Sequence, residues 1–143
     1  MTIAAILKTK GHDVARVPPT ATVAEVAARL GARGIGAVLV MDAADQLLGI
    51  VSERDIVRAL PQHGAAALDM TAAQLMTQVL HTTTPGTSCL AALEQMTERR
   101  VRHLPVLEGG RLAGIVSIGD VVKRRLDQLA YEADSLKAYV AGG

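Results

Sequence analysis

Apolar positions along the chain alternate between the runs typical of buried strands and the spacing typical of helices. Residues 37–41 form a continuous apolar run, which predicts a strand buried on both faces. Thr22-Val23-Ala24-Glu25 has the form of a capping box and predicts the start of a helix. The residues of this helix that are expected to face the core lie on one side of it: Val23, Val26, Ala27 and Leu30.

Applied to the whole chain, the same patterns predict that the same succession of helices and strands occurs twice. The first copy is expected to comprise a helix over 2–8, an extended segment over 14–17, a helix from 22 to Gly31 or Gly34, strands over 37–41 and 46–52, and a helix over 53–60 that ends before Pro61. An Ala-rich helical link over 65–76 follows. The second copy is expected to comprise an extended segment over 79–82, a helix over 88–100 with Leu90, Leu93 and Met96 inward, strands over 102–107 and 111–117, and a helix from Gly119 to Val140.

A repeated motif supports this duplication. Gly-Ile-Val-Ser-x-x-Asp begins at Gly49 and again at Gly114, 65 residues later. Two units are too few for a solenoid, and each sheet is too small to be stable alone. We therefore predict an α/β fold of two βαββα repeats, packed sheet-to-sheet with pseudo-twofold symmetry. The expected domains are 1–70, with the N-terminal helix, and 71–143, with the long C-terminal helix.

Composition limits the chemistry of the chain. Half of the 143 residues are hydrophobic, but two Tyr are the only aromatic residues among Phe, Trp and Tyr. Aromatic stacking therefore cannot be a main way of holding a ligand or a nucleic acid. The net charge is only +1, so the overall electrostatic field does not favour a partner of either charge, although residues 99–125 are locally basic. Cys89 is the only cysteine and lies in an apolar helical pattern, which predicts a buried small side chain.

Targeting and metal signals are weak. The start at Met1 lacks a basic region followed by an apolar run, and no apolar stretch reaches the roughly 20 residues that span a bilayer, so we expect a soluble cytoplasmic protein. His12, His63 and His81 lack metal-ligand spacing. No nucleophile–base set and no P-loop is found, so we expect neither a metal nor a catalytic cofactor, and no enzyme.

Ser52-x-x-Asp55 and Ser117-x-x-Asp120 each lie where a strand leads into a helix. One interpretation is structural: Ser and Asp cap the helix, and the acid suits the helix dipole. The other is functional. A helix N-terminus attracts anions, and a carboxylate beside it can accept hydrogen bonds from a ribose diol.

The doubled motif, with the Thr83 to Thr87 lead-in and the strand Leu104-Pro105-Val106, resembles a tandem pair of CBS (cystathionine beta-synthase) domains, or Bateman module. The resemblance covers about residues 6–125. It implies a regulatory module that binds an adenosine ligand, such as AMP, ADP, ATP, NAD or S-adenosylmethionine, in clefts between the repeats and signals occupancy to a partner protein. The resemblance also implies homodimers.

By position in the motifs, the resemblance implies ligand contacts from the following residues: Val17, Pro18, Thr20, Ile35, Gly36, Ala37, Ser52, Arg54, Asp55, Thr82, Thr83, Thr84, Pro85, Arg102, His103, Leu104, Pro105, Ser117, Gly119 and Asp120. The two Asp residues are expected to hold ribose. The Pro-flanked segments are expected to face adenine through main-chain groups. Arg54 can reach a phosphate whereas Gly119 cannot, so the two sites are expected to differ.

Two other functions stay open on sequence alone: a protein-interaction module with vestigial clefts, and a nucleic-acid-binding protein that uses the basic region 99–125. We expect a homodimer through the C-terminal helix, whose apolar residues exceed what one small repeat can cover. Those residues are Leu126, Leu129, Tyr131, Leu136, Tyr139 and Val140. The alternative is that this helix folds back onto its own chain.

Overall fold

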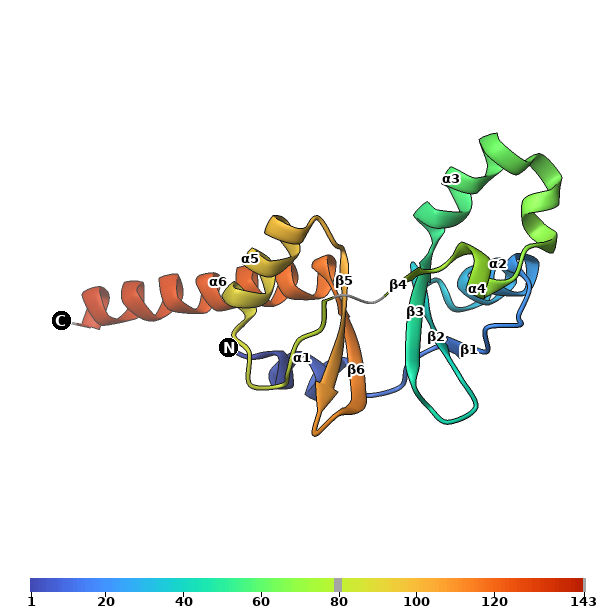
Figure 1. Ribbon diagram of the computed structural model, residues 1–143. Coiled ribbons are helices and arrows are strands. Elements are labelled where there is room, and N and C mark those ends of the chain that lie inside the picture. The colour runs from blue at the N-terminus through green and yellow to red at the C-terminus, as the bar shows by residue number, and fades with distance from the viewer. Residues whose placement is uncertain (79–80, 143) are drawn as a thin grey trace. The chain divides into compact units, whose positions relative to one another are not determined.

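The computed structural model describes residues 1–78 and 81–142, and it divides the chain into two compact units (Figure 1). The first-repeat unit is Val14–Leu80. The second-repeat unit combines Met1–Asp13 with His81–Gly143. Both contain strands and helices in the predicted order, so the predicted α/β class is confirmed.

The first-repeat unit is built on a sheet with the order β1-β2-β3-β4, in which β1 runs parallel to β2 and the other pairs are antiparallel. Every residue of β2 is buried, as its apolar run predicts. The capping box of Thr22 and Glu25 is present, and Gly34 ends the helix in a left-handed conformation. The elements are β1 (Arg16–Val17), α2 (Val23–Arg33), β2 (Ala37–Met41), β3 (Leu47–Ser52), α3 (Glu53–His63), the 3₁₀ helix η1 (Gly64–Asp69), α4 (Ala72–Leu75) and β4 (Thr77–Gln78).

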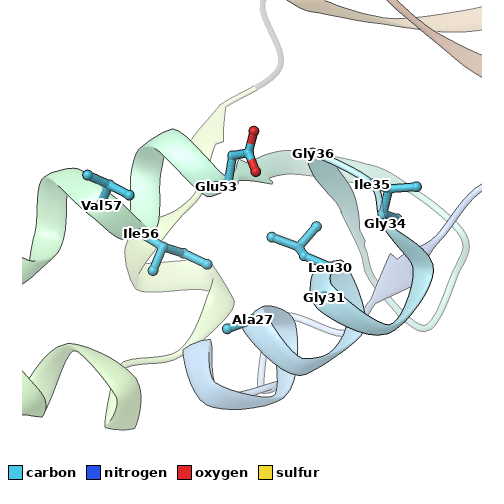
Figure 2. A pocket seen from close by; sticks show the side chains of 9 residues that line it. All are labelled: Ala27, Leu30, Gly31, Gly34, Ile35, Gly36, Glu53, Ile56 and Val57. Carbon is cyan, nitrogen blue, oxygen red and sulfur yellow. The ribbon is translucent and has the colours of Figure 1, made fainter.

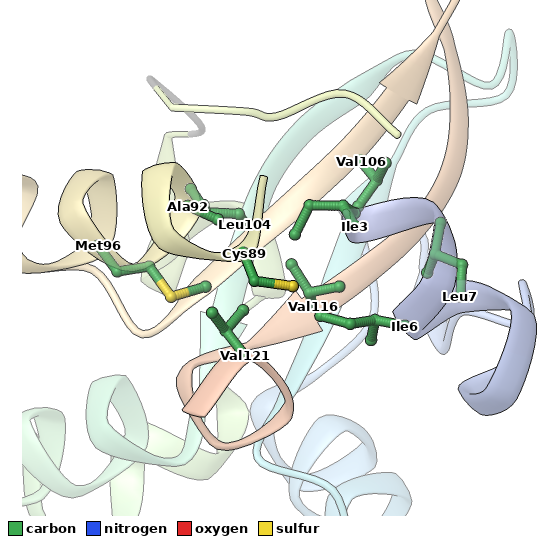
Figure 3. Packing of buried hydrophobic residues seen from close by; sticks show 10 residues of the cluster. All are labelled: Ile3, Ile6, Leu7, Cys89, Ala92, Met96, Leu104, Val106, Val116 and Val121. Carbon is green, nitrogen blue, oxygen red and sulfur yellow. The ribbon is translucent and has the colours of Figure 1, made fainter. Parts of the chain in front are cut away.

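The second-repeat unit pairs β5 with β6 in an antiparallel hairpin, and Thr83 bridges Val106 in parallel where the first repeat has β1. The elements are α1 (Ile3–Lys10), α5 (Cys89–Arg99), β5 (His103–Glu108), β6 (Arg111–Ser117) and α6 (Ile118–Gly142). Figure 3 shows the core, to which α1, α5, β5, β6 and α6 all contribute. Cys89 is buried in it, as predicted.

The helix that precedes each repeat packs on the other repeat. In α1, Ile3 N donates to Thr87 O (2.9 Å) and Ile6 and Leu7 enter the core of the second-repeat unit. In α4, Ala72 N donates in the same way to Ala21 O (2.7 Å). The division therefore differs from the predicted one at 70/71: helix α1 belongs with the second repeat and residues 71–78 with the first.

Several predicted details are corrected. Of the residues predicted inward on α5, Met96 is buried and Leu93 packs partly buried against the core, but Leu90 is 46% exposed and Cys89 and Ala92 are buried instead. Helix α3 continues through Pro61 to His63 and ends at Gly64, which has φ 58°. The link over 65–76 is not one helix, because a 3₁₀ turn precedes α4. The predicted extended segment over 79–82 falls partly on residues 79–80, which lie outside the described residues.

Candidate functional site

In the second-repeat unit, the strand register brings several predicted site residues together. His103 pairs with Ser117 across the β5–β6 hairpin, and Ile118 N donates to Arg102 O (2.8 Å) where α6 begins. Thr83 N donates to Pro105 O (2.9 Å), so the Thr82–Pro85 segment runs beside β5. These residues therefore line one edge of the hairpin next to the N-terminus of α6.

At this edge, Asp120 and Ser117 form reciprocal hydrogen bonds. Its Oδ2 accepts Ser117 N (2.8 Å), and Asp120 N donates to Ser117 Oγ (3.1 Å). The structural interpretation of the motif is thus correct: Ser and Asp cap the helix. The cap does not exclude ligand binding, because a carboxylate offers about four lone-pair sites and Oδ1 can accept a further bond.

Lys10, which sequence reasoning did not single out, is the charged partner of Asp120. Its Nζ lies 2.7 Å from Asp120 Oδ2 and also donates to Ile115 O (3.0 Å). The two residues are 110 positions apart, and only the packing of α1 on the second repeat brings them together. No local pattern in the sequence signals this pair.

Replacing Lys10 by methionine is expected to raise the pKa of Asp120. Burial raises the pKa of this carboxyl, but bonds from Lys10 and Ser117 and the charge of Lys10 outweigh burial, so the pKa lies below its ordinary value. A lowered folded pKa stabilises the protein above the unfolded pKa of about 4, and this stability is lost as pH falls through the folded pKa. The contribution is small, because the Lys10 side chain is 37% exposed.

Carboxyl-carbon NMR titration tests this expectation, with Lys8→Met on the exposed side of the same helix as control. An Asp120 pKa that does not change in Lys10→Met would contradict the assigned ion pair.

The corresponding motif in the first-repeat unit has a different partner. Asp55 Oδ2 accepts Ser52 N (2.8 Å) and Ser52 Oγ (3.0 Å), while Oδ1 accepts the hydroxyl of Thr77 (3.3 Å). Glu53 N donates to Gly36 O (2.9 Å), which ties the start of α3 to the start of β2. The first motif is thus satisfied by neutral groups and the second by a lysine.

Thr83 carries a buried polar atom that needs explanation. The residue is 5% exposed, and its Oγ1 is buried with no hydrogen-bond partner among the described residues. Buried hydroxyls are nearly always paired, and an unpaired one costs roughly 1–3 kcal/mol. Val17 holds the equivalent place in the first repeat, bridging Val40 as Thr83 bridges Val106. The hydroxyl is therefore specific to the second repeat.

The other predicted site residues fall into two groups. Val17, Ala37, Leu104 and Pro105 are buried, and because their side chains are apolar they can offer a ligand hydrogen bonds only through backbone groups. The rest are exposed or partly exposed: Pro18, Thr20, Ile35, Gly36, Ser52, Arg54, Asp55, Thr82, Thr84, Pro85, Arg102, His103, Ser117, Gly119 and Asp120.

A pocket of about 520 Å³ lies between α2 and α3 of the first-repeat unit (Figure 2). Leu30 and Ile56 approach it from opposite helices, and Glu53 is the only ionisable residue among those that line it. It shares only Ile35 and Gly36 with the predicted site. An acidic, otherwise apolar lining does not suit a phosphate, so we do not assign the nucleotide to this pocket.

Two further properties of the described residues bear on other classes of function. Across residues 1–78 and 81–142, no helix is both long and apolar enough to cross a membrane. In the same part of the chain, no group of three or more His, Cys, Asp or Glu is placed to hold a metal ion.

The relatives found by comparison with known proteins share one kind of domain. A mitochondrial CBS domain-containing protein of Arabidopsis thaliana is 35% identical over 126 residues, which cover 85% of this chain and 61% of that protein. The chain thus spans about three-fifths of this relative's length. A crystal structure of a CBS-domain containing protein from Agrobacterium tumefaciens is 44% identical, with a TM-score of 0.85, and covers 87% of this chain and 99% of that one.

A third relative was solved with a ligand. The CBS domain protein from Pyrobaculum aerophilum complexed with AMP is 28% identical, has a TM-score of 0.74, and covers 84% of this chain and 89% of that one. The family model of the CBS domain matches residues 6–62 and 72–127, which is most of the chain and both repeats. The chain therefore belongs to the CBS domain family, of which it carries a tandem pair.

Proposed function

We propose that this protein is a regulatory module that binds an adenosine ligand of the AMP, ADP, ATP or NAD type, and that it signals occupancy to a partner without catalysis of its own. The observation that carries the proposal is the unpaired, buried hydroxyl of Thr83 in the segment expected to face adenine. The AMP complex of the Pyrobaculum relative supports the choice of ligand class.

The contacts follow from the hairpin edge. Thr83 supplies its hydroxyl to the base once the side chains that cover it move aside, and Asp120 accepts from the ribose through Oδ1. Arg102 is exposed beside the N-terminus of α6, where its charge and the positive end of the helix dipole suit a phosphate. Lys10 holds the carboxylate ionised and oriented, because its Nζ is only 2.7 Å away. A cytoplasmic location is part of the same proposal.

The two repeats are proposed to bind with unequal affinity. The first repeat has Val17 in place of Thr83, a neutral hydroxyl in place of Lys10, and no basic pair before β2. Calorimetric titration of the full chain with AMP, ATP and NAD tests both ideas. We expect one micromolar site, about 8 kcal/mol, and a weaker one or none. A titration that fits two identical sites would contradict the asymmetry, and no binding by any of these ligands would contradict the function.

Replacing Thr83 by valine, the residue of the first repeat, is expected to weaken AMP binding without destabilising the fold. The lost hydrogen bond is worth roughly 0.5–1.5 kcal/mol, or about 2- to 13-fold in Kd. Without ligand, the variant should unfold at the same temperature or higher, since it buries no unpaired hydroxyl.

Calorimetry and thermal unfolding of the parent and of Thr83→Val measure the two effects. Thr97→Val, at an exposed position of α5 outside the predicted site, is the control. If Thr83→Val binds AMP as tightly as the parent, the hydroxyl does not contact the ligand.

A further inference from the structure

The last turns of α6 carry an apolar stripe that their own unit does not cover. Leu126 is 60% exposed, Leu129 43%, Leu136 63% and Val140 70%. Within the second-repeat unit, the helix therefore does not fold back over its own core. Figure 1 shows the red end of α6 running past α5 of the same unit. The CBS family match ends at residue 127, so most of the stripe lies beyond the matched repeat.

The stripe has the spacing of a coiled-coil seam. Its steps alternate between four and three residues, which places apolar side chains at the a and d positions of consecutive heptads. The seam positions are Val122 (d), Leu126 (a), Leu129 (d), Ala133 (a), Leu136 (d) and Val140 (a). The buried Val121 and the half-buried Arg125 and Gln128, which face the helix's own unit, each precede a seam position by one residue. The seam is thus turned by about 100° from the packed face.

The charges beside the seam select one partner and one orientation. Glu132 falls at g and Lys137 at e, five residues later. In a parallel pair of identical helices, a g residue meets the e residue five positions on in the partner, so Glu132 would face Lys137 twice. In the antiparallel pair that keeps the whole seam in contact, Glu132 would meet Glu132, and Lys123 would meet Lys137. Both are like-charge contacts, which disfavour that arrangement.

We propose that α6 forms a parallel two-stranded coiled coil with α6 of a second copy of this chain. The occupant of the stripe is thus this same helix, in register about a twofold axis parallel to it. Tyr131 at f and Tyr139 at g lie outside the seam, although the sequence alone predicts both in the dimer interface. The seam is short and has Ala133 at its centre, so we expect a reversible dimer that does not require nucleotide.

Sedimentation of the full chain at micromolar concentrations is expected to give twice the chain mass of 14.9 kDa. Leu129→Asp should return it to the chain mass, while Tyr131→Ser, on an exposed position away from the seam, should not. Glu132→Lys should weaken the dimer at least several-fold, and adding Lys137→Glu should restore it.

Oxidative cross-linking tests the orientation. Val140→Cys should form a disulfide-linked dimer, because residue 140 faces its own copy only in the parallel pair. In the antiparallel pair it would face residue 122, roughly 27 Å along the helix. The native Cys89 is buried and does not compete. A monomeric full chain, a Leu129→Asp variant that stays dimeric, or a dimer of the Val140→Cys variant that fails to cross-link would each overturn the proposal, whether or not AMP binds.

Discussion

Asp120→Ala is expected to weaken AMP binding by roughly 1.5–3 kcal/mol, the value of a hydrogen bond to a charged group. This corresponds to about 13- to 160-fold in Kd. Asp120 lies at the N-terminus of α6, next to Arg102 and one strand away from Thr83, where a ribose would join base and phosphate. Calorimetry of the parent and the variant measures the change.

The same substitution also removes a helix cap and the ion pair with Lys10, so a matched control is needed. Ser88→Ala provides one: Ser88 Oγ accepts Ala91 N (3.0 Å) and caps α5 in the same unit. Its loss should cost about 1 kcal/mol of stability but leave AMP affinity unchanged. If the two variants lose stability alike and neither loses affinity, Asp120 is only a cap.

Gly49→Ala is expected to destabilise the protein by roughly 1–3 kcal/mol, the range for overpacking a well-packed site. A Cβ at Gly49 would lie 2.5 Å from Met76 Sδ and 2.8 Å from the backbone oxygen of Thr77. The backbone oxygen cannot move aside without disturbing the β3–β4 pairing, in which Gly49 is opposite Gln78. The glycine that opens the first copy of the motif thus allows the close packing of residues 76–78 on β3.

Chemical denaturation of Gly49→Ala and Gly31→Ala measures this effect. Gly31 lies inside α2, and a Cβ added there would have no neighbouring atom within 4 Å, so alanine should stabilise by roughly 0.5–1 kcal/mol. Gly114→Ala, whose Cβ would meet Leu7 Cδ2 at 2.7 Å, should be milder than Gly49→Ala because only a side-chain end is in the way. Equal stability of Gly49→Ala and the parent would contradict the close approach.

Local signals in the sequence predicted much of the fold. The cap at Thr22, the fully buried β2 and the long α6 all follow from short-range patterns that packing reinforces. The failures are also local. Leu90 was predicted to be buried beside Leu93 and Met96, because a helical period fits more than one face, but Ala92 is buried and Leu90 is exposed. Pro61 looked like a terminator, but α3 continues two residues past it to His63, although Pro61 has no N–H to donate to the preceding turn.

The site was less predictable because its key partners are distant in the chain. The sequence motif placed Ser117 and Asp120 together, and the strand register added His103. Lys10 could not be predicted, since nothing in residues 1–13 indicates that this segment packs on the second repeat rather than the first. The unpaired state of the Thr83 hydroxyl is likewise a property of burial, which the Thr-rich segment alone does not reveal.

The most direct test of the central claim is an amide NMR titration of the full chain with AMP. The site described above predicts that the largest shift changes fall on Thr83, His103, Ser117 and Asp120, with smaller changes at the corresponding positions of the first repeat. The changes should need correspondingly higher AMP concentrations in Asp120→Ala but appear at the parent's AMP concentrations in Ser88→Ala. Shift changes confined to the pocket between α2 and α3, or none at millimolar AMP, ATP and NAD, would contradict an adenosine site at the N-terminus of α6.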